Sequence, residues 1–366
     1  MTLKLNYTAE RNPVISIEFE GNITNKILCI GDPHLGRRFI TGVPSHRLYE
    51  REETQYAELD RLLNPSDPLI DHIVIMGDLF DRFVVSPTTV LRAVELLRKA
   101  SEANSHIEYF VIPGNHDMTK DTTKKSSYQL FYEVFSYDWS ILEVNRNVAF
   151  NTPMSHFIYP DFNGNPNVYV GLYFEAYNAF RLIDYNMAIS DHYSEAPLKI
   201  AFGHWDSVDI ISSGYLPSAD LLADSDLVVS GHEHTYKEAF YPSHPTTPVL
   251  FTGSLQPYSH AEDPDKKIYV TVKSEDLDNY DLSKDFKYKC LRIECTPSFA
   301  LTEAVDCYSL AYKVIVPDAV VSSTTDESDV IQSYSERLST WLAEQDLEDS
   351  VRTDLENILT TKEYLD

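Results

Sequence analysis

The chain has 366 residues, 43% hydrophobic and 12% aromatic, which is enough for a full-sized globular core. Its 57 acidic and 30 basic residues give a net charge of −27, which argues against a nucleic-acid partner unless basic residues gather locally. Four scattered cysteines, no apolar run that could span a bilayer and no signal-peptide core predict a protein of the cytoplasm, or of the host cytoplasm if the source is viral.

The first half of the chain reads as alternating strands and helices. Residues 1–25 are a polar lead-in to which we assign no function, with one strand expected over Val14–Phe19. Short apolar runs then predict buried strands at Lys26–Ile30, Ile73–Met76 and Tyr109–Ile112. Helical spacing follows the first two strands, over Tyr49–Leu63 and from the Ser86-Pro87 start to Asn104.

The second half is less regular. A helix is expected near Ser126–Phe135, and further strands at Lys199–Phe202, Asp226–Val229, Val249–Phe251 and Ile268–Val272. The composition changes near Lys273, where a charged, turn-rich segment to Lys287 predicts a linker or long loop. We therefore expect three regions: a main domain over 1–273, a small appended α+β domain over 274–316, and a linker with C-terminal helices over 317–366.

Five predicted strand ends share one pattern, in which an apolar run and a small residue precede a metal-ligand type of side chain. The residues concerned are Asp32 with His34, Asp78, Asn115 with His116, His204, and His232 with His234. Each piece alone has an ordinary interpretation as a turn, a cap or a satisfied histidine. Five in order, each after a strand, favour one site at the carboxyl ends of the strands.

The donor types of this set are mixed nitrogen and oxygen, which suits manganese, iron or zinc and is poor for calcium or magnesium alone. The Asp78 carboxylate has two oxygens and can bridge two cations. If it is shared, the set supplies four protein ligands to each of two metals.

The series GDPHLG, GDLFD, GNHD, GHW and GHEH resembles the calcineurin-like metallophosphoesterases. More narrowly it is similar to the SbcD-type nuclease subunit of DNA break-repair complexes and its bacteriophage counterparts. That narrower resemblance rests on the arginines after the first motif, on Ser86-Pro87 after the second, and on the stretch from Gly253-Ser254 to Glu262-Asp263. It implies an α/β fold, with a two-sheet sandwich flanked by helices, a small appended domain and a C-terminal helical tail.

The resemblance also implies roles for the motif residues. One metal would be held by Asp32, His34, Asp78 and His234, and the second by Asp78, Asn115, His204 and His232. Two divalent ions, most commonly Mn²⁺ in these relatives, can activate a water and clamp a phosphodiester. His116 would protonate the leaving oxygen, and Asp117 would either orient His116 or close the turn. Asp81 is given no catalytic role, because some members have histidine there.

Further contacts are expected outside the metal site. Candidate DNA contacts are Arg37, Arg38, Lys120, Lys124 and Lys125, which follow the first and third motifs; they could equally be solvated loop residues. Two amphipathic helices in the tail would bind an SbcC-type coiled-coil ATPase or pack on their own domain, and a homodimer is expected. Their apolar positions are Ile331, Tyr334, Leu338, Trp341, Leu355 and Ile358.

The function that follows is a Mn²⁺-dependent DNA phosphodiesterase, with exonuclease activity on duplex ends and endonuclease activity on single strands. One alternative is a phosphatase or cyclic-nucleotide phosphodiesterase on the same scaffold, which the net charge favours. Another is a scaffold protein with a vestigial metal site.

Overall fold

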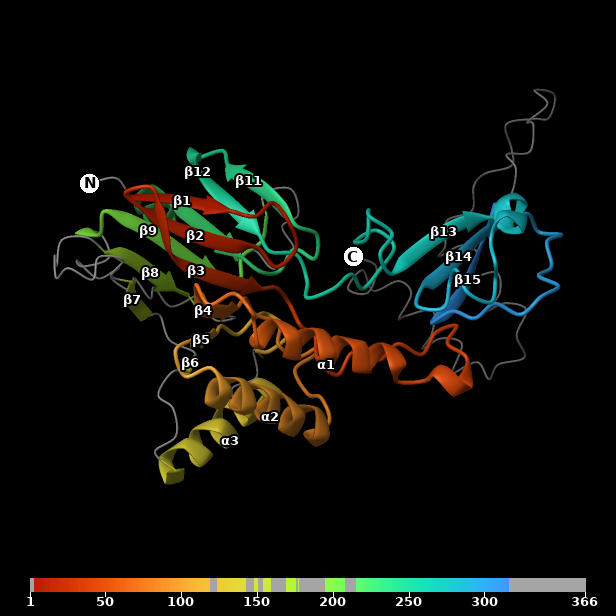
Figure 1. Cartoon of the computed structure of the whole chain (residues 1–366), viewed down its shortest axis with the longest axis horizontal. Helices are drawn as coiled ribbons and strands as arrows, with labels where there is room; N and C mark the ends of the chain where they lie inside the picture. Colours follow the sequence, from red (N-terminus) through yellow and green to blue (C-terminus); the bar gives the residue numbers. More distant parts are fainter. Residues whose placement is uncertain are drawn as a thin grey trace, which may run out of the picture. The chain divides into compact units, whose positions relative to one another are not determined.

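The computed structural model describes residues 3–118, 124–142, 148–150, 154–158, 169–175, 177, 195–207 and 215–315. Residues 1–315 belong to one compact unit, which holds three sheets and several helices (Figure 1). Among the described residues, no helix combines the length and the hydropathy needed to cross a bilayer.

The first sheet has six strands in chain order, and its last four are parallel. Its strands are β1 (Leu3–Tyr7), β2 (Val14–Phe19), β3 (Asn22–Ile30), β4 (Ile70–Ile75), β5 (Glu108–Val111) and β6 (Val148–Phe150). The connections carry η1 (Ser45–Arg47), α1 (Glu50–Leu63), α2 (Pro87–Ala103) and, after β5, α3 (Ser127–Leu142). At the start of α2, the Ser86 hydroxyl accepts a hydrogen bond from the Thr89 amide at 3.1 Å, as expected for a helix with proline at its first position.

The second sheet also has six strands, in the order β11-β12-β10-β9-β8-β7. Its strands are β7 (Met154–Ile158), β8 (Val170–Phe174), β9 (Leu198–Gly203), β10 (Leu227–Ser230), β11 (Lys237–Tyr241) and β12 (His244–Phe251). The four central strands β12, β10, β9 and β8 run parallel to one another. The short helix α5 (Ala219–Asp224) precedes β10.

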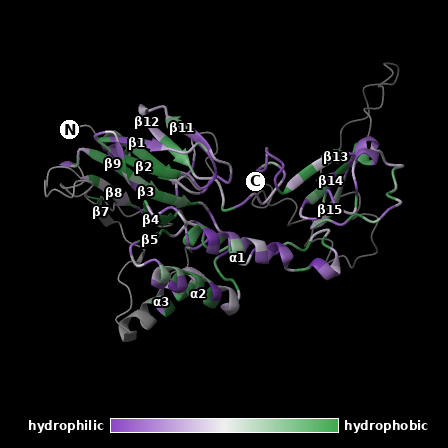
Figure 2. Ribbon diagram, in the orientation of Figure 1, coloured by the Kyte–Doolittle hydropathy of each residue, from purple (hydrophilic) through white to green (hydrophobic). Residues whose placement is uncertain are grey.

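The two sheets pack face to face because their central strands are apolar on both sides. In β4 and the residue after it, Val74 and Met76 point into the core between the sheets, with Phe202 and Val229 of the second sheet among their neighbours. The alternate residues Ile73 and Ile75 point the other way, into the core shared with α1, α2 and α3. Figure 2 shows this hydrophobic interior along the strands. The predicted two-sheet α/β sandwich flanked by helices is confirmed.

The third sheet corrects one prediction. It consists of three parallel strands, β13 (Tyr269–Lys273), β14 (Cys290–Cys295) and β15 (Ser309–Val314). The segment 274–287 was predicted to be a linker or long loop. It begins instead with the 3₁₀ helix η2 (Ser274–Asn279), and Leu277 and Phe286 are buried in the core of this sheet. These two apolar anchors hold a segment whose charge suggested solvent exposure.

Candidate metal centre

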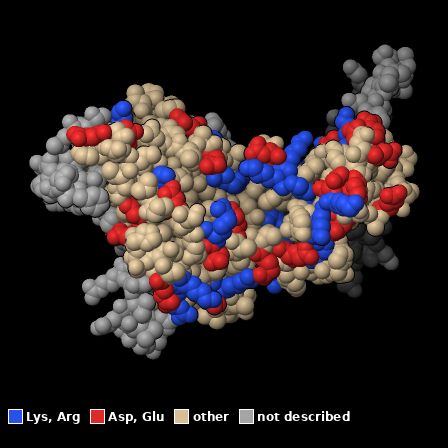
Figure 3. Space-filling model, viewed as in Figure 1, with Lys and Arg blue, Asp and Glu red and all other residues tan. Residues whose placement is uncertain are grey.

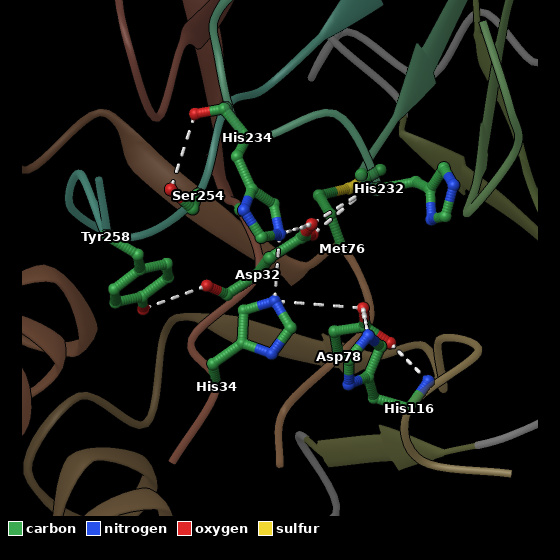
Figure 4. A network of polar contacts seen from close by, with 12 residues as sticks. Asp32, His34, Met76, Asp78, His116, His232, His234, Ser254 and Tyr258 are labelled. Carbon is green, nitrogen blue, oxygen red and sulfur yellow. Dashed lines mark hydrogen bonds and ion pairs between the residues drawn. The ribbon is translucent and has the colours of Figure 1, made fainter. Parts of the chain in front are cut away.

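The loops that leave β3, β4, β5, β9 and β10 meet at one place, where the carboxyl ends of parallel strands from both sheets face each other. All seven predicted ligand side chains lie there, and Figure 4 shows Asp32, His34, Asp78, His232 and His234 among them. Burial is deep: the side chains of Asp32, His34, Asp78 and His204 are at most 2% exposed. The seven residues form two clusters, which we call cluster one and cluster two.

Cluster one consists of Asp32, His34, Asp78 and His234. The Nε2 atoms of His34 and His234 are 2.9 Å apart. His234 Nε2 lies 3.7 Å from Asp32 Oδ2, and His34 Nε2 lies 3.8 Å from Asp78 Oδ2. Two imidazole nitrogens and two carboxylate oxygens therefore converge on one point.

Cluster two consists of Asp78, Asn115, His204 and His232. The Asn115 side-chain oxygen is 2.9 Å from both His204 Nε2 and His232 Nδ1. Those two nitrogens are 3.3 Å apart, and His204 Nε2 is 3.4 Å from Asp78 Oδ2. The donor set is again mixed nitrogen and oxygen.

A single oxygen of Asp78 joins the two clusters. Asp78 Oδ2 is the atom near both His34 and His204, whereas Oδ1 accepts a hydrogen bond of 2.8 Å from the His116 amide. The sequence predicts that Asp78 bridges two cations and does not assign its two oxygens. The geometry points Oδ2 at both clusters and uses Oδ1 to hold the loop that carries Asn115 and His116.

The donor spacing fits divalent cations. Metal–ligand bonds of about 2.0–2.2 Å place neighbouring ligand atoms roughly 3 Å apart, and the closest donor pairs here are 2.9 to 3.4 Å apart. Without a cation, the oxygen and nitrogen atoms of the two clusters are mostly hydrogen-bond acceptors that face one another. A few protons on them cannot supply a donor to every acceptor. The arrangement of these side chains therefore fits the binding of cations better than hydrogen bonding among the side chains themselves.

Groups behind the ligands fix which histidine nitrogen faces each cluster. His204 Nδ1–H donates to the Met76 carbonyl at 2.8 Å, so Nε2 is the nitrogen left to ligate. His232 is reversed: its Nε2 contacts Asp206 Oδ1 at 2.8 Å, and Nδ1 faces cluster two. In cluster one, Glu262 Oε1 lies 3.4 Å from His234 Nδ1.

Three of the candidate ligands have left-handed backbone conformations that non-glycine residues seldom adopt. The φ angles are +46° at His34, +47° at Asp78 and +76° at His232. Each costs on the order of 1 kcal/mol or more, and such residues concentrate at functional sites. The strain turns each side chain back toward the clusters directly after its strand ends.

The small residues before the ligands are also explained by close approach. A Cβ atom on Gly77 would lie 2.3 Å from His204 Nδ1, and one on Gly231 would lie 2.1 Å from the Met76 carbonyl oxygen. Glycine at these positions lets the loops of the two sheets come close enough for their ligands to meet.

Replacing Gly77 with alanine is therefore expected to displace His204 and to remove the metal of cluster two. The matched control is Gly21→Ala, because Gly21 also has a positive φ (+88°, against +102° at Gly77) but has no atom within 4 Å of the added Cβ. Both variants should lose about 1–2 kcal/mol from backbone strain. Metal analysis should show a loss only for Gly77→Ala; equal metal content in both would contradict the packing argument.

His116 and Asp117 follow Asn115, and only one of them faces the clusters. The His116 ring is 43% exposed; its Nδ1 donates to the Asp81 carbonyl at 2.5 Å, and its Nε2 lies 4.0 Å from Asp78 Oδ2. Two roles were predicted for Asp117, orienting His116 or closing the turn, and the structure supports the second. The Asp117 carboxylate accepts hydrogen bonds from the amides of Leu79, Phe80 and Gly114, so it closes the turn and joins the second and third motifs.

Burial and mutual charge shift the ionisation of the cluster residues. Burial, with the charge of Asp78, raises the pKa of Asp32 to about 6. Burial alone would lower the pKa of His204, but the carboxylates of Asp78 and Asp32 raise it to about 10. Burial holds the pKa of His34 well below its ordinary value. Burial lowers the pKa of His232 to about 4, whereas the carboxylates of Glu262 and Asp32 raise the pKa of His234 against the effect of burial. Each cluster therefore combines one histidine of lowered pKa with one of raised pKa.

Metal binding is consequently expected to release protons and to tighten as the pH rises. A metal at cluster two must displace the proton of His204 at neutral pH, and one at cluster one competes with the proton of Asp32 below about pH 6. Calorimetric titration with Mn²⁺ in two buffers of different ionisation enthalpy should detect proton release at pH 7, from His204 and from the fraction of His234 that is protonated. An affinity that stays constant from about pH 5.5 to 8 would contradict this.

The predicted DNA contacts have mixed surroundings. Arg38 is exposed, whereas Arg37 is one-third exposed, lies 3.7 Å from Asp81, and its guanidinium sits over the Tyr258 ring at 4.8 Å. Lys125 pairs with Glu133 at 2.6 Å. Lys124 is described and exposed. Outside the described residues lie Lys120 and the tail positions Ile331, Tyr334, Leu338, Trp341, Leu355 and Ile358.

Sequence reasoning missed the residues behind the ligands. Asp206 follows His204 by two positions, a spacing that could have drawn attention to it, but nothing in the sequence links it to His232. Glu262 was noted in the sequence only as part of the stretch from Gly253-Ser254 to Glu262-Asp263, with no role of its own. Tyr258, whose ring packs against both His34 and His234, had no local signal at all.

Comparison with known families finds a match to the calcineurin-like phosphoesterase model over residues 25–236, more than half of the chain. The matched range includes all seven candidate ligands. Enzymes of this family hydrolyse phosphoesters with divalent metals, in agreement with the two clusters.

Individual relatives are more distant. The DNA double-strand break repair protein Mre11 of Saccharolobus solfataricus is 34% identical over 114 residues, which is 30% of this chain and about a quarter (26%) of that protein. Among solved structures, GAP50, the anchor in the inner membrane complex of Plasmodium, is 15% identical with a TM-score of 0.36, covering 63% of this chain and 72% of that one. A dimetal phosphatase from Danio rerio is 11% identical with a TM-score of 0.34, covering 63% and 88%.

Proposed function

The chain belongs to the calcineurin-like phosphoesterase family, and on that premise we propose that it is a two-metal phosphodiesterase that cleaves DNA. The observation that supports this most is the pair of clusters joined by Asp78 Oδ2. In this proposal the seven residues are the ligands of two divalent ions, most commonly Mn²⁺ in the family members that the motifs resemble. When bound, such ions lower the pKa of water and neutralise the charge that builds on a phosphodiester.

The residues of the chain supply the rest of the chemistry. The two clusters would place the scissile phosphate beside Asp78, within reach of His116. Because Nδ1–H of His116 donates to the Asp81 carbonyl, the proton that His116 can give is on Nε2, the nitrogen that faces the clusters. His116 would therefore act as an imidazolium acid toward the departing oxygen.

Three observations favour DNA over a small phosphoester. The first is the match between a segment of this chain and a protein named for DNA double-strand break repair. Arg37 and Arg38 are a second, because they directly follow the loop that carries His34 and can contact backbone phosphates. The third is where the negative charge lies: residues 316–366 hold 13 acidic and three basic residues, a net −10 of the total −27. On the face drawn in Figure 3, groups of basic side chains lie among acidic ones.

The decisive experiment is cleavage of end-labelled duplex and single-stranded DNA with Mn²⁺, beside hydrolysis of p-nitrophenyl phosphate. A DNA phosphodiesterase should shorten duplex ends and cut single strands while turning over the monoester poorly. The second candidate, a phosphatase or cyclic-nucleotide phosphodiesterase, is favoured by the net charge. It would show the reverse pattern.

We also propose an SbcC-type coiled-coil ATPase as the partner and a homodimer as the working assembly, both from the motif resemblance. Deleting residues 327–366 should leave Mn²⁺-dependent cutting of single strands intact and abolish capture of the ATPase in a pull-down. The full-length chain is the control. Retention of the partner by the truncated chain would exclude the tail as its binding site.

A further inference from the structure

We propose that the turn between β1 and β2, formed by Arg11 and Asn12, positions the loops of cluster one, with Arg11 as a positioning residue for His234. The proposal rests on the metal-binding part of the proposed function and not on the substrate. No motif in the sequence indicates a role for this turn.

Arg11 gathers the loops that hold His234. Its Nη1 donates to the His234 carbonyl at 2.8 Å, to the Ser254 carbonyl at 2.8 Å and to the Ser254 hydroxyl at 2.7 Å. Its Nη2 donates to the Glu262 carbonyl at 2.8 Å. Arg11 thus donates hydrogen bonds to the backbone of His234 and to the backbone of Glu262. The Glu262 carboxylate in turn contacts the His234 ring.

Asn12 extends the same link to the other side of cluster one. Its side-chain oxygen accepts from the Gly31 amide at 2.9 Å, one residue before Asp32, and its side-chain nitrogen donates to the Leu255 carbonyl at 3.0 Å. Its own amide donates to the Thr252 carbonyl at 3.0 Å. Asn12 is buried and has a φ of +53°, a left-handed turn that asparagine tolerates well.

The physical reason for an arginine here is its fork of donors. The planar guanidinium can satisfy several carbonyls in fixed directions, whereas a lysine offers a single compact ammonium. Removing the guanidinium leaves these partly buried acceptors without that donor. The loops of His234, Ser254 and Glu262 would then lose the donor they share, and the His234 carbonyl would keep only its hydrogen bonds from the Ser254 amide and hydroxyl.

The direct contacts of this link go mainly to the loops of cluster one, although His232 of cluster two lies on the same loop as His234. All of the contacts of Arg11 and Asn12 given above go to the loops after β3, β10 and β12, and those of Arg11 go to His234, Ser254 and Glu262. His204 is held instead by Met76, and the His232 ring by Asp206. Both residues of the turn also precede residue 25, where the match to the family begins, so this link belongs to the chain's own N-terminal hairpin.

The test is Mn²⁺ titration of the full-length Arg11→Met protein, followed by electron paramagnetic resonance. Affinity at one of two sites should fall about 10–100-fold, the range typical for loss of a group that orients a ligand, and the spectrum should change from a coupled pair to single ions. The matched control is Arg61→Met, because Arg61 lines the same cavity as Arg11 but is 66% exposed and forms its ion pair with Glu58, on its own helix. Two unchanged affinities, or an equal loss at both sites, would overturn the proposal.

The affected site is identified by combining variants. Added to His234→Ala, Arg11→Met should have no further effect on metal binding, whereas added to His232→Ala it should retain its full effect. If Arg11→Met does not fold, Arg11→Lys replaces it. For Arg11→Lys, the rise in melting temperature that Mn²⁺ produces should shrink; an equal drop with and without Mn²⁺ would indicate a merely structural role and overturn the proposal.

Metal binding is read directly in these experiments. A wild-type protein that binds two Mn²⁺ ions but leaves DNA intact would refute the proposed substrate and leave the role of Arg11 standing.

Discussion

Replacing Asp78 with asparagine is expected to abolish tight binding of both metal ions and with it all hydrolysis. The asparagine side chain can keep the hydrogen bond from the His116 amide through its oxygen, but its amide nitrogen would then replace Oδ2, the atom that faces both clusters. An amide nitrogen carries no charge and does not ligate. We expect a loss of at least about 100-fold in affinity at each site, more than removal of an orienting group costs.

The control for this prediction lies on the same strand. Asp71→Asn changes an aspartate near the opposite end of β4, where it contacts His72 and lies far along the strand from the loop of Asp78. Elemental analysis should find two metals per chain in Asp71→Asn and none in Asp78→Asn. A single metal retained by Asp78→Asn would mean that Asp78 serves only one cluster.

Much of this fold could be predicted because its central strands are short apolar runs that end abruptly. The run Ile73–Met76 marks the end of β4 (Ile70–Ile75), and Ser86-Pro87 marks the start of α2, since both signals are local. The strand-end pattern also predicted the location of the metal centre, because a residue that directly follows a buried parallel strand has little freedom in its position.

The groups that act across long distances could not be predicted. Asp206 and His232, or Arg11 and His234, meet only after both sheets have assembled, and no local spacing encodes such pairs. The choice between the two roles of Asp117 could not be made from the sequence for a related reason. The Asp117 carboxylate accepts from the amides of Leu79 and Phe80 in the loop after β4 and of Gly114 in its own loop, and the first two become neighbours only in the folded chain.

The edge strands β1 and β11 escaped prediction because half of their residues face solvent. Leu3–Tyr7 alternates between partly buried and exposed positions, and Lys237–Tyr241 does the same. Alternation over five residues with charged members is a weak signal. Because β1 was not predicted, the turn that follows it was not recognised either, and that turn carries Arg11 and Asn12.

Replacing His116 with alanine is expected to lower kcat for DNA about 10²–10⁴-fold, the usual contribution of a general acid, while both metals stay bound. His116 differs from the seven ligands in exposure and distance. Its ring is 43% exposed, and its Nε2 is 4.0 Å from the shared oxygen of Asp78. His116 also lies with His34 and Asp78 in a group compact enough to hold a cation, so the metal content of His116→Ala separates the two roles. Loss of a metal would make His116 a ligand.

The leaving group provides the sharper test. The deoxyribose oxygen of DNA leaves poorly without a proton, whereas p-nitrophenolate leaves readily as an anion, so loss of a general acid should slow DNA cleavage far more than hydrolysis of bis(p-nitrophenyl) phosphate. His106→Ala is the control, because His106 is exposed and precedes β5 at the end opposite His116. If both substrates slow equally in His116→Ala, His116 positions the phosphate and does not protonate the leaving oxygen, since only proton donation depends on how stable the departing anion is.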